Sequence, residues 1–152
     1  MDRSYGERLR TRRELLGLSQ RALAAAAGVA QPLVSAIESG RRQATAAAAA
    51  ALDEQLVLRP SVALARRRAE VADAVRRYGG HDAVVFGSVA LGTDAPGSDL
   101  DLMVAFEPGR DIVDLLALEA ELQEILTVPV DVVSAGSTGP VARRARTEAV
   151  AL

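Results

Sequence analysis

The sequence has no cysteine and a single histidine, and these absences exclude several kinds of site. Without cysteine the chain forms no disulfide, no thiolate zinc site and no cysteine nucleophile. One histidine excludes a multi-histidine metal site. Lysine is absent as well, so all 18 basic residues are arginine, and aromatic residues make up only 3%. Any hydrophobic core is therefore aliphatic.

Long apolar runs are also missing. No run reaches the roughly 18 residues that cross a bilayer. The N-terminal stretch MDRSYGERLRTRR lacks the apolar segment of a secretory signal. We therefore expect a cytoplasmic protein that does not contact membranes. With 49% hydrophobic and 25% charged residues, the composition is typical of a globular chain, and 152 residues suit one ordinary domain or two small ones.

The net charge of −2 conceals an uneven distribution. Residues 1–68 hold twelve arginines and six acidic residues, whereas residues 69–152 hold six arginines and fourteen acidic residues. A basic half suits contacts with phosphate groups, and an acidic half suits a metal ion or a basic partner.

The pattern along the chain changes near Arg59-Pro60-Ser61 and predicts two domains, 1–58 and 59–152. Four short helices are expected in the first domain. They cover about 6–16, 20–27, 32–39 and 45–56. In the second domain, a long helix precedes three strands, and two further helices follow the second and third strands. These elements cover about 61–78, 83–86, 100–106, 111–126, 128–133 and 139–152.

Three details of the second domain can be tested against a structure. The helix after Asp111 is expected to turn a set of apolar residues toward the core. This set is Ile112, Leu115, Leu116, Leu122 and Ile125. Asp94 is expected on a loop surface, and the last helix is expected to carry the chain to its final residue.

The first domain has the spacing of a helix-turn-helix, whose second helix fits the DNA major groove. Residues 9–29, LRTRRELLGLSQRALAAAAGV, and 34–42, VSAIESGRR, resemble the phage-repressor-like, Xre-type helix-turn-helix family. The resemblance implies operator DNA as a partner and a homodimer on paired half-sites. The implied DNA-binding residues are Gln20, Gln31, Ser35, Arg41 and Arg42. A helix-turn-helix that only binds protein or dimerises is the alternative.

The second domain concentrates its chemistry around one segment. A strand leads into Gly87-Ser88, ten residues intervene, and the Asp99-x-Asp101 pair opens the next strand. The two-residue period of a strand places both carboxylates on one face. Carboxylates this close repel each other unless a cation lies between them, and Mg²⁺ is held by few carboxylates together with substrate phosphates. Asp131, alone among valines on the third predicted strand, is the third candidate ligand.

This arrangement resembles the polymerase-β-type nucleotidyltransferase superfamily, in particular its minimal nucleotidyltransferase branch, over roughly residues 70–152. The final residues, RTEAVAL, also resemble that branch. The resemblance implies that Asp99, Asp101 and Asp131 hold two Mg²⁺ ions and that Asp131 acts as the base. Gly87 and Ser88 would hold the β,γ-phosphates of ATP. Together the two resemblances imply an α+β two-domain protein, an all-α helix-turn-helix bundle followed by a small α/β nucleotidyltransferase fold with a mixed sheet.

The chain departs from this family at Val89 and Leu91, where many members carry arginine. If those arginines grip phosphates, the contact is missing here or is supplied by another arginine. The candidates are Arg110, Arg143 and Arg144.

Minimal nucleotidyltransferases of this kind are commonly antitoxins that attach AMP to a helical HEPN-type ribonuclease toxin. The resemblance therefore implies an antitoxin of a type VII-like toxin–antitoxin pair, which adenylylates its cognate toxin and binds operator DNA to autoregulate. Three alternatives stay open. In the first, the protein is a transcriptional regulator whose nucleotidyltransferase fold only senses nucleotide. In the second, it is an enzyme that modifies RNA or a small molecule such as an aminoglycoside. In the third, it neutralises its toxin by binding alone.

Overall fold

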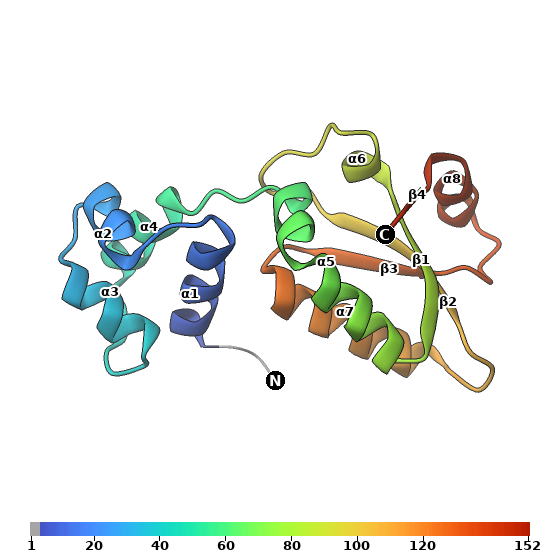
Figure 1. The fold of residues 1–152 in the computed structure, drawn as a ribbon, viewed down its shortest axis with the longest axis horizontal. Helices are drawn as coiled ribbons and strands as arrows, with labels where there is room; N and C mark the ends of the chain where they lie inside the picture. The colour runs from blue at the N-terminus through green and yellow to red at the C-terminus, as the bar shows by residue number, and fades with distance from the viewer. Residues whose placement is uncertain (1–3) are drawn as a thin grey trace. The chain divides into compact units, whose positions relative to one another are not determined.

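The computed structural model describes residues 4–152, so the first three residues of the predicted N-terminal domain lie outside the described residues. The chain divides into two compact units, one ending at Leu58 and the other beginning at Arg59. The first unit is helical, and the second combines helices with a sheet (Figure 1). No helix within residues 4–152 is both long and apolar enough to cross a membrane.

The charge difference between the units is smaller than the division at residue 68 indicates. The first unit carries eight arginines and six acidic residues, and the second carries ten and fourteen. Arg59 and the arginines at 66–68 belong to the second unit. The helical unit is therefore only weakly basic overall, with a net charge of +2.

The helical unit consists of four short helices around an aliphatic core. They are α1 (Tyr5–Leu15), α2 (Gln20–Ala27), α3 (Gln31–Glu38) and α4 (Ala46–Gln55). Side-chain oxygens of Ser4, Ser19 and Thr45 accept backbone N–H groups and cap α1, α2 and α4. The buried core comprises Leu9, Leu23, Ala24, Val34, Ile37, Leu52 and Leu56.

The second unit is built on a four-stranded mixed sheet with strand order β3-β2-β1-β4. Strands β2 and β3 are parallel, and β1 is antiparallel to both β2 and β4. The strands are β1 (Gly80–Phe86), β2 (Leu100–Phe106), β3 (Val130–Ser134) and β4 (Val150–Ala151). The helices are α5 (Pro60–Arg77), α6 (Gly87–Ala90), α7 (Ile112–Leu126) and α8 (Pro140–Glu148).

The two faces of the sheet are covered differently. Helices α5 and α7 lie side by side along one face (Figure 1). On β2, Leu100, Leu102 and Val104 are fully buried. Met103 points to the other side, where it packs with Phe86 of β1 and with α8. Asp101 shares the face of Met103, because side chains alternate along a strand.

The expected orientation of α7 was wrong at two positions. Ile112 and Leu116 are 63% and 53% exposed, and the buried stripe of this helix is Leu118, Leu122 and Leu126. The helix carries apolar side chains around most of its circumference, so periodicity alone does not select the buried face.

The prediction that the last helix reaches the chain end was also wrong. Helix α8 ends at Glu148, and Val150 and Ala151 pair antiparallel with Val85 and Val84. Strand β2 pairs with one edge of β1, and the two residues of β4 pair with the other edge. The strand turns the chain end back along β1 and anchors Glu148 near the end of that strand.

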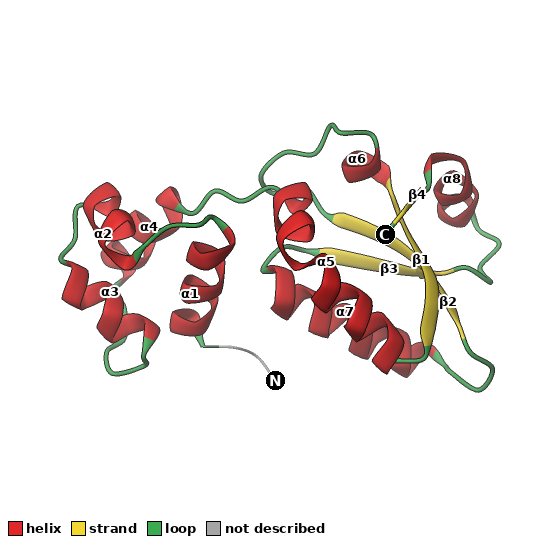
Figure 2. Cartoon of the chain, in the orientation of Figure 1, coloured by secondary structure: helices red, strands yellow, loops and turns green. Residues whose placement is uncertain are grey.

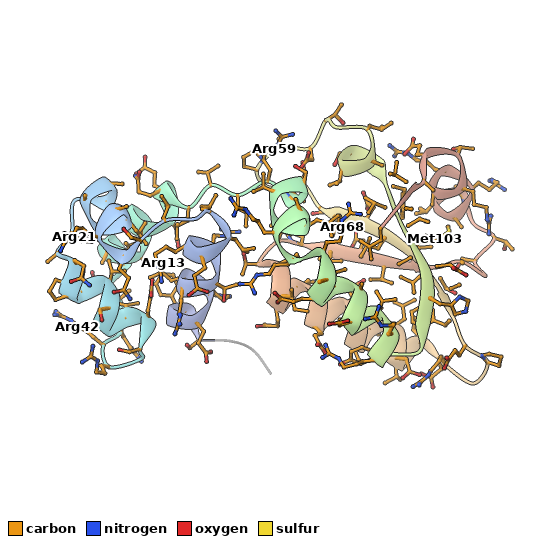
Figure 3. The ribbon with its side chains drawn as sticks, in the orientation of Figure 1. Arg13, Arg21, Arg42, Arg59, Arg68 and Met103 are labelled. Atoms are coloured by element: carbon orange, nitrogen blue, oxygen red, sulfur yellow. The ribbon has the colours of Figure 1, made fainter. Side chains whose placement is uncertain are left out.

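Asp94 is not on a loop surface, as was expected, although it lies in the loop between α6 and β2 (Figure 2). Its side chain is fully buried. Oδ1 accepts a hydrogen bond from Arg59 Nη2 at 2.9 Å, and Oδ2 accepts one from the backbone N–H of Ser61 at 2.9 Å. Figure 3 shows Arg59 beside this loop. Asp94 therefore caps α5 and ties the loop to that helix.

Candidate functional site

The site begins at the turn between β1 and α6. Gly87 has φ of 67°, a left-handed conformation that favours glycine. A Cβ atom at this position would also overlap Oδ2 of Asp101. Glycine is therefore required both by the backbone conformation and by the close approach of a carboxylate.

The predicted acidic residues lie on neighbouring strands. Asp101 of β2 is the Cα partner of Asp131 on the parallel strand β3, so the two side chains project from the same face of the sheet. Asp99 precedes Asp101 by two residues and is exposed just before β2. The structure thus brings Asp101 and Asp131 side by side, with Asp99 two residues before Asp101.

The surroundings of Asp101 disfavour its negative charge. Burial raises the pKa of Asp101, and the charges of Asp131 and Asp99 raise it further. Arg144 opposes this effect, while Glu148 adds to it. Within residues 4–152, Asp101 forms no ion pair. Its negative charge is therefore largely uncompensated by the protein.

The donor chemistry of these carboxylates fits a hard divalent cation such as Mg²⁺, which prefers oxygen ligands and relieves their mutual repulsion. Within the described part of the chain, however, no three acidic or histidine side chains already form a closed ligand cluster. The carboxylates are neighbours, and they are not arranged as a finished cage. Holding a cation requires adjustment of their side chains.

Glu148 is a residue of this site that the sequence analysis did not single out. Its Oε2 accepts a hydrogen bond from the Gly87 N–H at 3.3 Å, and its Oε1 accepts one from Arg144 Nε at 3.0 Å. Glu148 belongs to the RTEAVAL ending, whose resemblance to the family was noted without a role for any residue. Its spacing of four from Arg144 was the signal available for their ion pair.

Ser88 follows Gly87 on α6 and is half-buried. Its backbone carbonyl accepts hydrogen bonds from the N–H and the hydroxyl of Thr93. Its own hydroxyl has no hydrogen-bond partner within residues 4–152. The Ser88 hydroxyl is therefore available to a ligand beside Gly87.

In the helical unit, a hydrogen-bond network links α1, α2 and α3. Arg13 donates to both oxygens of Glu38, at 2.6 and 2.9 Å. Gln20 also donates to Glu38 at 2.9 Å and accepts from Gln31 at 3.0 Å. Burial raises the pKa of Glu38, but the hydrogen bonds from Arg13 and Gln20 outweigh burial and lower it. This network orients two of the predicted DNA-binding residues, Gln20 and Gln31, together.

The other predicted DNA-binding residues lie in and after α3. Ser35 is half-buried, and Arg41 Nη2 donates to its hydroxyl at 3.4 Å. Arg41 Nε also donates to Ser39 at 2.9 Å. Arg42 is exposed, and Figure 3 shows it projecting from the loop after α3, whereas Arg13 lies among the helices. The arginines follow the helix that would enter the groove.

Both units match families of known proteins. Residues 68–150, more than half of the chain, match the nucleotidyltransferase domain family, and residues 9–56 match a helix-turn-helix family. A Methanocaldococcus jannaschii protein that carries the name protein adenylyltransferase is 38% identical over 64 residues, which are 42% of this chain and 69% of that protein.

Two solved structures resemble the second unit. One, named for a minimal nucleotidyltransferase, has 40% identity and a TM-score of 0.55 over 60% of this chain and 95% of that chain. The other was solved as a toxin–antitoxin with AMP-PNP. It has 23% identity and a TM-score of 0.50 over 55% of this chain and 69% of that chain, and it supports the fold alone.

The fold and the family matches define a two-part protein with a helix-turn-helix unit and an enzymatic α/β unit. The chain belongs to the nucleotidyltransferase domain family. It is a nucleotidyltransferase with an Xre-like helix-turn-helix at its N-terminal end.

Proposed function

We propose that the protein is an antitoxin that transfers AMP from ATP to a cognate toxin and binds operator DNA. The observation that carries the transfer activity is the group of uncompensated carboxylates around Asp101, directly beside the Gly87 turn. The name of the Methanocaldococcus jannaschii relative supports protein as the acceptor. The helix-turn-helix fusion supports a regulatory setting.

In this proposal, Asp99, Asp101 and Asp131 hold two Mg²⁺ ions, which supply neutralisation of phosphate charge and activation of the attacking hydroxyl. Gly87 contributes its backbone N–H to the β,γ-phosphates of ATP, and Ser88 contributes its hydroxyl. Asp131 accepts the proton of the attacking hydroxyl group. These are the residues that we assign to domain 59–152.

The acceptor oxygen forms a bond to the α-phosphorus of ATP, and the bond from that phosphorus to the α,β-bridging oxygen breaks. Pyrophosphate leaves, and the hydroxyl proton passes to Asp131. The products are AMP esterified to the acceptor and pyrophosphate.

We assign DNA binding to domain 1–58. Gln20 and Gln31 are oriented by the Glu38 network at the start of α2 and α3. Arg41 and Arg42, which follow α3, contact DNA phosphates. Ser35 lies on α3, between Gln31 and these arginines. The unit is small and only weakly basic, so we propose that it binds as a homodimer on two half-sites.

The transfer activity is tested by incubating the full chain with Mg²⁺, ATP labelled at the α-phosphate, and the product of the adjacent gene. We expect label on that protein and release of pyrophosphate, and we expect the partner to be a small helical HEPN-type ribonuclease. A matched control replaces Asp82, an exposed residue of β1, by asparagine. Label on RNA or on an aminoglycoside, and none on protein, would favour the enzyme acting on those substrates instead.

Neutralisation by binding alone is a separate outcome. In that case Asp101→Asn neutralises the toxin as well as the wild type does. A protein that binds ATP but labels no acceptor would favour the nucleotide-sensing regulator.

DNA binding is tested with a fragment from upstream of the protein's own gene, measured at several salt concentrations. We expect Arg42→Gln to weaken binding to all sequences and to reduce the salt slope by about 1, because one phosphate contact is lost. Gln31→Ala should instead reduce discrimination between operator and unrelated DNA. Equal binding of both variants and the wild type would contradict this assignment.

A further inference from the structure

The turn and short helix after β1, residues 87–91, carry no positive charge. Val89 lies on α6, and Leu91 caps its end with a side chain that is 55% exposed. Neither residue can neutralise a triphosphate. If the site binds ATP, a cation from elsewhere in the unit must approach the same turn, and the structure distinguishes the three arginine candidates.

Arg110 is at the wrong end of the sheet. Its Nη1 donates to Asp114 at 3.3 Å, and its guanidinium lies so close to Gly79 that a Cβ atom there would overlap it. Gly79 precedes β1, whereas Gly87 follows it. A strand of this length separates the two ends by about 20 Å, which is beyond the reach of an arginine side chain.

Arg144 lies at the turn itself. Its Nε donates to Glu148, and the other carboxylate oxygen of Glu148 accepts the Gly87 N–H. The charge of Arg144 lowers the pKa of Asp101, and the charge of Glu148 raises it. Arg143, the adjacent residue, makes no side-chain hydrogen bond or ion pair with the part of the chain that the structure describes. Of the three candidates, only Arg144 is linked to Gly87.

We propose that Arg144 binds the β,γ-phosphates of the nucleotide, and that Glu148 is a positioning residue that holds Arg144 beside Gly87 until the nucleotide displaces its carboxylate. The proposal rests on the proposed function, because it takes ATP as the ligand of the Gly87 turn.

The contacts of Glu148 are those that a phosphate group would make. A carboxylate and a phosphate are both anions that accept N–H groups and pair with arginine. The bond from Gly87 N–H to Glu148 is 3.3 Å, longer than the roughly 2.9 Å of a typical N–H···O bond, so its loss costs little. When the phosphates take this N–H, Arg144 exchanges one anionic partner for another.

The exchange also has an electrostatic reason. Glu148 adds a negative charge to a site that already holds three aspartates, and the triphosphate adds several more. A Glu148 side chain that stayed in place would repel the ligand. Removing its charge while keeping its shape, as in Glu148→Gln, should therefore favour the nucleotide.

The test measures binding of AMP-PNP and of AMP to the full chain with Mg²⁺, by calorimetry. We expect Arg144→Gln to weaken AMP-PNP binding by about tenfold and to leave AMP binding nearly unchanged, because AMP lacks the β,γ-phosphates. Arg144→Lys should restore part of the loss. Glu148→Gln should bind AMP-PNP a few-fold more tightly than the wild type. Arg143→Gln is the matched control and should bind like the wild type.

Several results would overturn the proposal. Wild-type affinity of Arg144→Gln for AMP-PNP excludes the phosphate contact, while the proposed function stands because the wild type still binds. Equal loss of AMP and AMP-PNP binding would indicate a merely structural role for Arg144. Weaker AMP-PNP binding by Glu148→Gln would exclude displacement of its carboxylate, and an equal loss in Arg143→Gln would remove the specific assignment. A wild type that binds neither ligand would contradict the proposed function itself.

Discussion

Each unit of the protein holds an acidic residue that is at least partly buried, and the two lie in opposite surroundings. Glu38 of the helical unit accepts two hydrogen bonds from Arg13 and one from Gln20, and its pKa is lowered. Asp101 of the nucleotidyltransferase unit has two aspartates as neighbours, and its pKa is raised, first by burial and then by those charges.

We infer from this difference that Glu38 stabilises the fold, and we propose that Asp101 binds a ligand. The Glu38 charge is matched within the protein, so it links three helices and requires nothing from outside. The Asp101 charge is a cost to the free protein, and a site retains such a cost where a cation or substrate relieves it. Asp94 resembles Glu38, because its carboxylate accepts hydrogen bonds from Arg59 and from the Ser61 N–H within the protein.

The largest expected effect is loss of nucleotidyl transfer in Asp101→Asn, by about a thousandfold or more, because the variant lacks a proposed ligand of the catalytic cation. Transfer is measured with labelled ATP, and operator binding is measured in parallel. Operator binding should be unchanged, since Asp101 belongs to the other unit. Comparable loss of both activities would break the separation between the units.

The next largest effect is unfolding of the helical unit by Glu38→Ala. Removing one partner of a buried pair costs about 3–5 kcal/mol because Arg13 is left uncompensated. A unit of 58 residues has a total stability of roughly 3–9 kcal/mol, so the loss is a large share of it. Hydrogen exchange should rise across residues 4–58 and stay low in β1 and β2. Glu54→Ala, at an exposed position of α4, is the control and should leave exchange unaltered.

A smaller effect is expected from Asp94→Asn, which should destabilise the second unit by about 1–3 kcal/mol as its charged hydrogen bonds are lost. Burial raises the pKa of Asp94, but the bonds from Ser61 and Arg59 outweigh burial and lower it below 3.8. Its contribution is therefore present above that pH and disappears as the pH falls through the lowered pKa. Chemical denaturation between pH 3 and 7 tests this, because the difference from the wild type should shrink toward acid.

The smallest effect is that of Asp101→Asn on the stability of the metal-free protein. This substitution should stabilise the fold, whereas Asp94→Asn should destabilise it. The folded state raises the pKa of Asp101 above 3.8, so this group favours folding below that pH and loses the benefit as the pH rises through the raised pKa. At neutral pH in the presence of a chelator, Asp101→Asn should thus unfold at a higher temperature than the wild type. Below pH 3.8 the two should converge. A lower unfolding temperature for the variant at neutral pH would place Asp101 with the structural acids.

Features of the fold that depend on local spacing were predictable from the sequence. The alternation along residues 100–106 separates Asp101 from the buried Leu100 and Leu102. The Gly87 turn follows from a strand that ends at a Gly-Ser pair. The four helices of the first unit were likewise marked by caps and glycine turns. In each case the relevant residues lie within one or two elements of each other.

What could not be predicted depends on contacts between distant residues. The pairing of Arg13 with Glu38 crosses 25 positions, and that of Gly87 with Glu148 crosses 61, so neither has a local signature. The exposure of Leu116 follows from which face of an apolar helix meets the sheet. The burial of Asp94 depends on a cap that its loop supplies to another helix.

The measurement that tests the central contrast most directly is thermal unfolding of the full chain, with and without saturating Mg²⁺, for the wild type and Asp101→Asn. A cation that binds only the folded carboxylate site stabilises that state in proportion to its occupancy. We expect Mg²⁺ to raise the unfolding temperature of the wild type and to leave that of Asp101→Asn unchanged. An equal rise in both proteins, or none in either, would contradict the proposal that the Asp101 carboxylates form a cation site.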